Sequence, residues 1–166
     1  MSYMLTPTIG LMQITTWART TYDEFIQHWG ELQRVGAKAL VLDLRDNTGG
    51  YMTSAVAVAN EFLQEGQLIV YTEGRTMPRE DVVANGEGLL QKMPLVVLVN
   101  ENSASASEIF SGAMQDHDRA MIIGRQTYGC LLYPSQGGCH RPRRGHHTCT
   151  RRDEEEWLSH RGRRRL

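Results

Sequence analysis

The chain has 166 residues, a hydrophobic content of 40% and a formal net charge of −1 at pH 7. That length is sufficient for one domain with a real core, and the near-neutral charge points to no polyanionic partner such as a nucleic acid. No apolar run approaches the ~20 residues that span a membrane, and the first ten residues, MSYMLTPTIG, lack the basic flank and apolar core of a signal peptide.

The composition changes at residue 130. Residues 1–129 hold nine Lys and Arg against fifteen Asp and Glu, whereas residues 130–166 hold nine Arg against four acidic residues. All three cysteines lie in the second part, which contains no Ala, Val, Ile, Met, Phe, Asn or Lys. Such a segment cannot bury enough apolar surface to offset the entropy of the chain. We therefore predict a folded domain over 1–129 and a disordered or non-native tail over 130–166.

The first half of the predicted domain alternates between strand and helix patterns. A β-branched, partly alternating stretch at 9–16 indicates a strand. Thr21 and Glu24 have the spacing of a capping box, and apolar residues then recur at helical intervals until Gly36. The apolar run 39–44 is typical of a strand that is covered on both faces. A glycine turn at 47–50 and a helix over about 53–63 follow.

The second half continues the alternation. We expect strands at 68–71, 95–99 and 121–123 and a helix at 106–117, and the polar segment 73–93 is a loop or a hairpin. Alternating elements with apolar strands predict an α/β domain with a largely parallel sheet and flanking helices. In such a sheet the loops at the carboxyl ends of the strands build the site, which here are 45–50 and 100–107.

Each of these two loops has a structural and a chemical interpretation. Ser105 stands three residues before Glu108, which is a capping box, and Ser103 could cap one turn earlier. The same place suits a nucleophile, because the free N–H groups of a helix N-terminus stabilise a developing oxyanion. The pair Gly49-Gly50 could form a simple turn, or it could let the backbone approach a reacting carbonyl closely.

Three motifs in register favour the chemical interpretation. They are LVLDLRDNTGG at 40–50, SASASEIF at 103–110 and AMQDHDRA at 113–120, and they continue into IGRQTYG at 123–129. Together they resemble the carboxyl-terminal processing proteases, the tail-specific serine endopeptidases of family S41, over residues 8–129. The resemblance implies a ClpP/crotonase-like core. It also implies polypeptide substrates recognised at their C-terminal tails, a periplasmic or exported location, no cofactor, and an upstream PDZ domain that this chain does not contain.

The resemblance also implies roles for individual residues. The middle serine of the SASAS run, Ser105, corresponds to the nucleophile, and the oxyanion hole corresponds to Gly49 or Gly50 together with Ala106. Asp116 lies 11 residues beyond Ser105 and either supports the site or is an ordinary acid on a helix surface. The family places a lysine base directly after the T-[FY]-G sequence, and this position is Cys130 here.

Nothing in the sequence replaces the missing lysine. A thiol is mostly protonated near neutral pH, so Cys130 is a poor base, and the family's helper glutamine is replaced by Pro134. The chain's two lysines, Lys38 and Lys92, have ordinary explanations at a helix end and in a loop, and no spacing favours a histidine of the tail. We therefore expect the chain to be inactive as it stands. The coincidence of the lost lysine with the change in composition suggests that 130–166 is out-of-frame translation.

Two other functions stay open at this stage. One is a non-catalytic pseudo-protease that binds peptides or assembles as a homo-oligomer. The other is a crotonase-like acyl-CoA enzyme, against which the SASASE run argues. The tail's Cys139-His140 with His146, His147 and Cys149 could bind zinc, but it lacks paired ligand spacing, so we expect no metal site. Its arginines stand beside an acidic run, which argues against a nucleic-acid partner.

Overall fold

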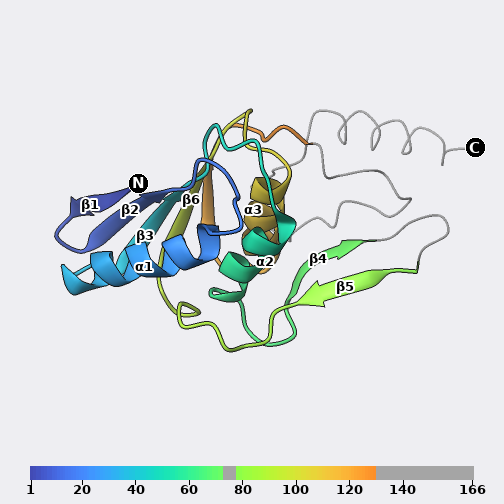
Figure 1. Ribbon diagram of the computed structural model, residues 1–166, viewed down its shortest axis with the longest axis horizontal. Helices are drawn as coiled ribbons and strands as arrows, with labels where there is room; N and C mark the ends of the chain where they lie inside the picture. Colours follow the sequence, from blue (N-terminus) through green and yellow to red (C-terminus); the bar gives the residue numbers. More distant parts are fainter. Residues whose placement is uncertain (73–77, 130–166) are drawn as a thin grey trace, which may run out of the picture.

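The computed structural model describes residues 1–72 and 78–129, and its centre is a five-stranded sheet (Figure 1). The strand order is β1-β2-β3-β6-β7. β1 pairs antiparallel with β2, and the other four strands are parallel. Their bounds are β1 Ser2–Thr6, β2 Ile9–Gln13, β3 Ala39–Asp43, β6 Leu95–Val99 and β7 Met121–Gly124.

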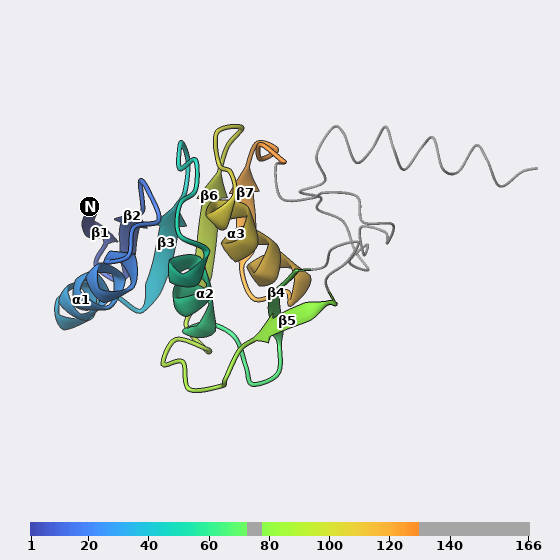
Figure 2. The same ribbon diagram turned by 45° about the vertical axis from the view of Figure 1, so that its right-hand side comes forward.

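Three helices pack on one face of this sheet (Figure 2). Because the parallel strands follow one another in a single direction across the sheet, right-handed crossovers bring every connecting helix to the same side. The helices are α1 Thr21–Arg34, α2 Met52–Asn60 and α3 Ala106–Asp116. Their apolar faces meet the sheet in one core cluster, whose fully buried members include Phe25, Phe62, Phe110, Leu42 and Val97.

A separate hairpin lies beside α2 and α3. It consists of β4 (Leu68–Thr72) and β5 (Glu80–Val83), which pair antiparallel. His117, just after α3, contacts the hairpin through its Nε2 atom, 2.8 Å from the carbonyl oxygen of Leu68. The hairpin therefore extends the helical side of the molecule rather than the sheet.

The observed elements confirm the predicted α/β order with a mostly parallel sheet, with local differences. The sequence prediction missed β1, and the predicted strand at 9–16 ends at Gln13. α1 begins at Thr21, so Thr21 is not its cap. The Thr21 hydroxyl accepts the Ala18 N–H instead, and Glu24 accepts the Thr20 hydroxyl. The predicted tail 130–166 lies outside the described residues and stays a prediction.

Candidate active site

Ser105 occupies a strained turn at the start of α3. Its backbone has φ 54° and ψ −118°, and Ala106 is the first residue of the helix. A positive φ is uncommon for a residue with a side chain and costs about 1–3 kcal/mol, so the surroundings must hold it in place. The turn lies at the carboxyl end of β6, beside the loop that follows β3 (Figure 2).

The two neighbouring serines are structural. The Ser103 hydroxyl donates to the Leu44 carbonyl at 2.8 Å, and Ser103 is fully buried. The Ser107 hydroxyl accepts the Trp17 indole N–H at 2.9 Å and donates to the Asn47 carbonyl at 3.1 Å. Ser105 is half-buried, between two serines that are fully buried. The alternation of the SASAS run therefore points its outer hydroxyls into the fold and leaves the middle one nearest to solvent.

Asn47 organises the glycine loop. Its side-chain amide donates to the Ile14 carbonyl at 2.8 Å, and its Oδ1 accepts the Gly49 N–H at 2.9 Å. Its own carbonyl accepts the Ala104 N–H at 3.0 Å, which joins this loop to the one that carries Ser105. The N–H of Gly49 is therefore occupied. Within the described ranges no partner is recorded for the N–H groups of Gly50 and Ala106.

Positions 49 and 50 require glycine, because neighbouring segments of the chain approach their backbone closely. Gly49 has φ 110°, and a Cβ built on it would lie 2.6 Å from the Ser105 Cβ and 3.1 Å from the Ser105 Oγ. Gly50 has φ 138°, and its Cβ would lie 2.2 Å from the Trp17 carbonyl oxygen. Any larger residue at either position would displace a backbone. The structure thus brings together the predicted residues Ser105, Gly49, Gly50 and Ala106.

Charged groups hold the ends of the same two loops. Burial by itself would raise the pKa of the Asp43 carboxyl, but hydrogen bonds from the Arg45 side chain and backbone outweigh it and hold the pKa below its ordinary value. Hydrogen bonds from the side-chain amides of Asn102 and Asn100 likewise lower the pKa of the Asp46 carboxyl. Asp46 and the two asparagines therefore tie the loop after β3 to the loop after β6.

Glu108 connects the turn that carries Ser105 to the segment after β7. One carboxylate oxygen, Oε2, accepts the Ser105 N–H at 2.9 Å, as the capping box predicted. The other oxygen, Oε1, accepts the Thr127 hydroxyl at 2.9 Å and the Gly129 N–H. The sequence identified Glu108 only as a local cap and did not single out Asn47. The position of Asn47, two residues before a double glycine, was the available signal.

The remaining candidates lie elsewhere. Asp116 is exposed at the last residue of α3, about 16 Å along the helix from Ser105, so the two are not brought together. Lys38 and Lys92 are exposed just before β3 and β6. They therefore lie at the amino ends of these strands, whereas Ser105 lies beyond the carboxyl end of β6. Cys130 lies outside the described residues. Among those that are described, no cluster of three or more His, Cys, Asp or Glu could hold a metal.

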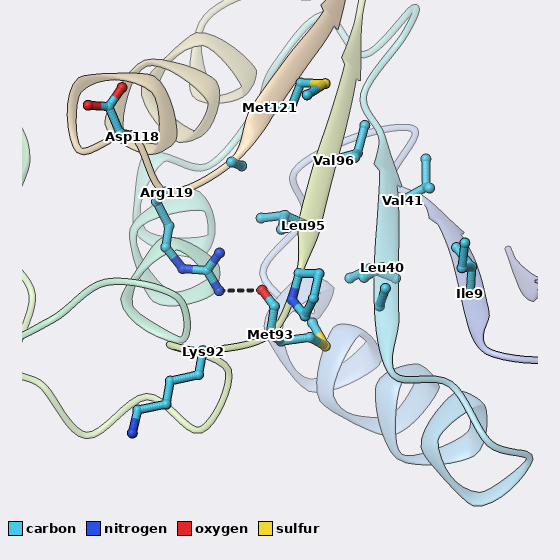
Figure 3. Close-up of a pocket in the computed structure, with 13 residues that line it drawn as sticks. Ile9, Leu40, Val41, Lys92, Met93, Leu95, Val96, Asp118, Arg119 and Met121 are labelled. Carbon is cyan, nitrogen blue, oxygen red and sulfur yellow. Dashed lines mark hydrogen bonds between the residues drawn. The ribbon is translucent and has the colours of Figure 1, made fainter.

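The structure also has a hollow of about 420 Å³ whose lining does not include Ser105 (Figure 3). It is lined by Ile9, the first residues of β3, β6 and β7, and the segments that lead into them. Arg119 beside it is committed to structure, because it donates to the carbonyl oxygens of Phe62, Leu90 and Met93. The hollow therefore lies at the amino ends of the strands and is not part of the serine site.

Comparison with known proteins identifies the family of the chain. The model of the family described as "Peptidase family S41" matches residues 8–137. The chain belongs to peptidase family S41. The match begins at residue 8, as the sequence motifs predicted, and it ends at residue 137, eight residues beyond the predicted end at 129.

Individual S41 relatives give the same result. The chain is 39% identical over 127 residues to the carboxyl-terminal-processing protease of Synechocystis sp., covering 76% of this chain and 29% of that protein. It is 38% identical over 121 residues to the carboxy-terminal processing protease CtpA of Bacillus subtilis, covering 73% and 26%. The solved photosystem II D1 C-terminal processing protease superposes with a TM-score of 0.66 at 36% identity, covering 73% of this chain and 31% of that one.

The S41 chain described here thus spans less than a third of the length of these relatives. None of the helices in its described part is long and apolar enough to cross a membrane.

Proposed function

We propose that this chain carries the nucleophile and oxyanion hole of an S41 serine endopeptidase that cleaves polypeptides near their C-terminal tails. The observation that carries the proposal is the strained Ser105 turn, which is held at a helix N-terminus and packed directly against Gly49. A substrate can reach a serine hydroxyl that is held in this way. The N–H groups beside it stabilise the negative charge that develops on the carbonyl oxygen of the substrate. The function of the named relatives supports the choice of substrate class.

The chemistry assigned to these residues is acyl transfer. Ser105 Oγ bonds to the carbonyl carbon of the scissile peptide and loses its proton to a base, and the carbonyl oxygen becomes an oxyanion. The N–H groups of Gly50 and Ala106 accommodate that oxyanion, since the Gly49 N–H is already donated to Asn47. Collapse then breaks the C–N bond, the base returns its proton to the leaving amine, and water hydrolyses the acyl-enzyme.

The lysine that the family resemblance implies as the base has no counterpart at the expected position. The resemblance to the family places a lysine at position 130, where the sequence has Cys130. Lys38 and Lys92 are both at the far edge of the sheet and cannot accept the Ser105 proton. We therefore propose that the chain does not hydrolyse peptides as it stands and, in that state, acts at most as a peptide-binding or assembly module. A periplasmic or exported location, which the resemblance to the family implies, belongs to the same proposal.

The proposal is tested by restoring the missing part. Residues 130–166 are replaced by an S41-like continuation that contains the lysine and the glutamine, and the protein is treated with a fluorophosphonate probe. We expect the unmodified chain to show no labelling above a Ser105→Ala blank and the restored chain to be labelled at Ser105. A restored, folded chain that stays unlabelled would contradict the assignment of Ser105 as the nucleophile.

The single change Cys130→Lys gives a further prediction. We expect it to restore little turnover of a peptide with an apolar C-terminus, because the amine must lie about 3 Å from the serine oxygen and be neutral near pH 7–8. Pro134 replaces the glutamine that would orient the amine, and it also lacks a backbone donor. Strong activity from Cys130→Lys alone would show that the present tail builds the site, and the out-of-frame interpretation would be wrong.

A further inference from the structure

Trp17 holds the glycine loop through its backbone. Its N–H donates to the Gly49 carbonyl at 3.0 Å, and its carbonyl accepts the Tyr51 N–H at 2.7 Å. These two hydrogen bonds enclose the peptide that joins Gly49 to Gly50, and the Thr16 hydroxyl adds a longer bond to the same Gly49 carbonyl at 3.3 Å. Because the carbonyl and the N–H of a planar trans peptide point in opposite directions, the Gly50 N–H points away from Trp17.

Trp17 holds helix α3 through its side chain. The indole N–H donates to the Ser107 hydroxyl at 2.9 Å, and that hydroxyl donates in turn to the Asn47 carbonyl at 3.1 Å. The indole ring also packs against Phe110, further along α3, with 5.9 Å between the ring centroids. Trp17 is 1% exposed, so water scarcely competes for its hydrogen bonds. One residue therefore connects the glycine loop to the helix that begins directly after Ser105.

We propose that Trp17 is a positioning residue for the oxyanion hole, which fixes the Gly50 N–H relative to Ser105 and the Ala106 N–H. Donors that are held in place beforehand stabilise an oxyanion best, because they need not reorient during the reaction. Hydrogen bonds to the Gly49 carbonyl also polarise the peptide and make its N–H a stronger donor. The role of these N–H groups as an oxyanion hole rests on the proposed function, whereas the contacts of Trp17 do not.

Two variants remove the side-chain connection, one at each end. Trp17→Phe keeps an aromatic ring against Phe110 but removes the indole N–H, and Ser107→Ala removes its acceptor. Trp29→Phe and Ser111→Ala are the matched controls. Trp29 belongs to the same core cluster, and no partner is recorded for its indole N–H in the part of the chain that the structure describes. The Ser111 hydroxyl donates to carbonyls of its own helix.

Nuclear magnetic resonance of the full chain gives two measurements of the glycine loop. Hydrogen exchange of the N–H groups at positions 17, 49 and 51 reports how often the loop opens, whereas exchange in the central strands β3 and β6 reports global unfolding. A nuclear Overhauser effect between Gly49 Hα and Ser105 Hβ reports the contact between the loop and the proposed nucleophile. These protons are close because the Cα of Gly49 lies directly against Ser105.

We expect the wild-type chain to protect all three N–H groups and to show this Overhauser effect. Trp17→Phe and Ser107→Ala should each lower protection at positions 17, 49 and 51 by about fivefold or more and weaken the Overhauser effect, since each loses the same buried hydrogen bond. The double variant should lose less than the product of the two single effects, because they act on one connection. Trp29→Phe and Ser111→Ala should change protection at these positions by less than about twofold.

Three results would overturn the proposal. The first is unchanged protection and an unchanged Overhauser effect in Trp17→Phe and Ser107→Ala. The second is an equal loss in Trp29→Phe, which would mean that the loop only follows the stability of the core. The third is a wild-type loop without this protection. If Trp17→Phe fails to fold, the comparison of Ser107→Ala with Ser111→Ala decides. No measurement uses the reactivity of Ser105, so failure here is separate from a failure to react with the fluorophosphonate.

Discussion

Gly49 lies directly against the turn that carries Ser105, and we expect Gly49→Ala to lower the free energy of unfolding by at least about 2 kcal/mol. The added Cβ would meet the Ser105 Cβ at 2.6 Å and the Ala104 carbonyl at 2.9 Å, at a φ of 110°. The control is Gly112→Ala in α3, where a Cβ meets nothing within 4 Å and should stabilise the helix by up to about 1 kcal/mol. Urea unfolding measures both, and equal stabilities would contradict the prediction.

Ser107 should matter for stability although it plays no part in the proposed chemistry. In Ser107→Ala the indole N–H of Trp17, a residue that is 1% exposed, loses its acceptor, so we expect a loss of about 1–3 kcal/mol. Ser111→Ala is the matched control. Its buried hydroxyl donates within the helix, to the Ser107 carbonyl at 2.8 Å and to the Glu108 carbonyl at 3.5 Å, and its loss should cost less than about 1 kcal/mol. Equal losses in urea unfolding would mean that the Trp17 bond contributes nothing.

At the residue scale the sequence predicted which residues form the site but not which role each of them has. The SASAS run and the double glycine are local signals, and both lie in the predicted loops. The side chain of Asn47 accepts the Gly49 N–H and so determines which glycine N–H is available. The Glu108 carboxylate contacts the segment after β7 through Thr127 and Gly129. The contacts of Glu108 join segments that are distant in the chain, so no local spacing reveals them, whereas Asn47 lies only two residues before Gly49.

At the scale of the elements, the strand β3 and the loop after it are joined by the Asp43–Arg45 pair. Because the pKa of Asp43 is lowered in the folded chain, its contribution to stability is present above the unfolded pKa of about 3.9 and is lost as pH falls through the folded value. We expect the free energy of unfolding to fall below about pH 4, and to fall less steeply in Asp43→Asn. Urea unfolding at a series of pH values measures this.

A second aspartate–arginine pair of the same spacing is the control for this pH dependence. Asp81 and Arg79 of the β4–β5 hairpin are 47% and 46% exposed, whereas the Asp43 side chain is 5% exposed. We therefore expect Asp81→Asn to change stability by less than about 1 kcal/mol. If the wild-type chain and Asp43→Asn lost stability in parallel on acidification, the buried Asp43 carboxylate would not be the cause.

The elements that the sequence predicted well are those buried by the fold. The apolar runs of β3 and β6 and the helical periodicity of α1 report burial directly. β1 was missed because it is an edge strand that alternates between half-buried and exposed residues and follows no apolar run. For the segment 73–93 the sequence predicts a loop or a hairpin, and the structure places one strand in it, β5, which pairs with the preceding strand β4.

At the scale of the whole molecule, the face of the sheet opposite the helices has no covering element among the described residues (Figure 2). Tyr3, Leu11, Val41, Val96 and Met121 pair in register across all five strands, so their side chains share one face. Leu11 on the second strand, β2, is 8% exposed, whereas Met121 on the edge strand β7 is 65% exposed. Exposed apolar patches of this kind mark interaction surfaces.

We therefore expect the chain to associate with itself through this face and a Met121→Lys, Ile123→Lys double variant to do so much less. Both residues lie on the edge strand β7, with exposures of 65% and 46%, so lysines there can reach solvent without entering the core. Leu89→Lys is the control, because this residue is 86% exposed but belongs to the loop before β6. Sedimentation velocity over a range of protein concentrations should show the wild type and the Leu89→Lys variant shifting to larger species as concentration rises, and the double variant remaining a monomer. If all three proteins behaved alike, the apolar row would not be an association surface, and its exposure would have to be explained by contacts within a longer chain.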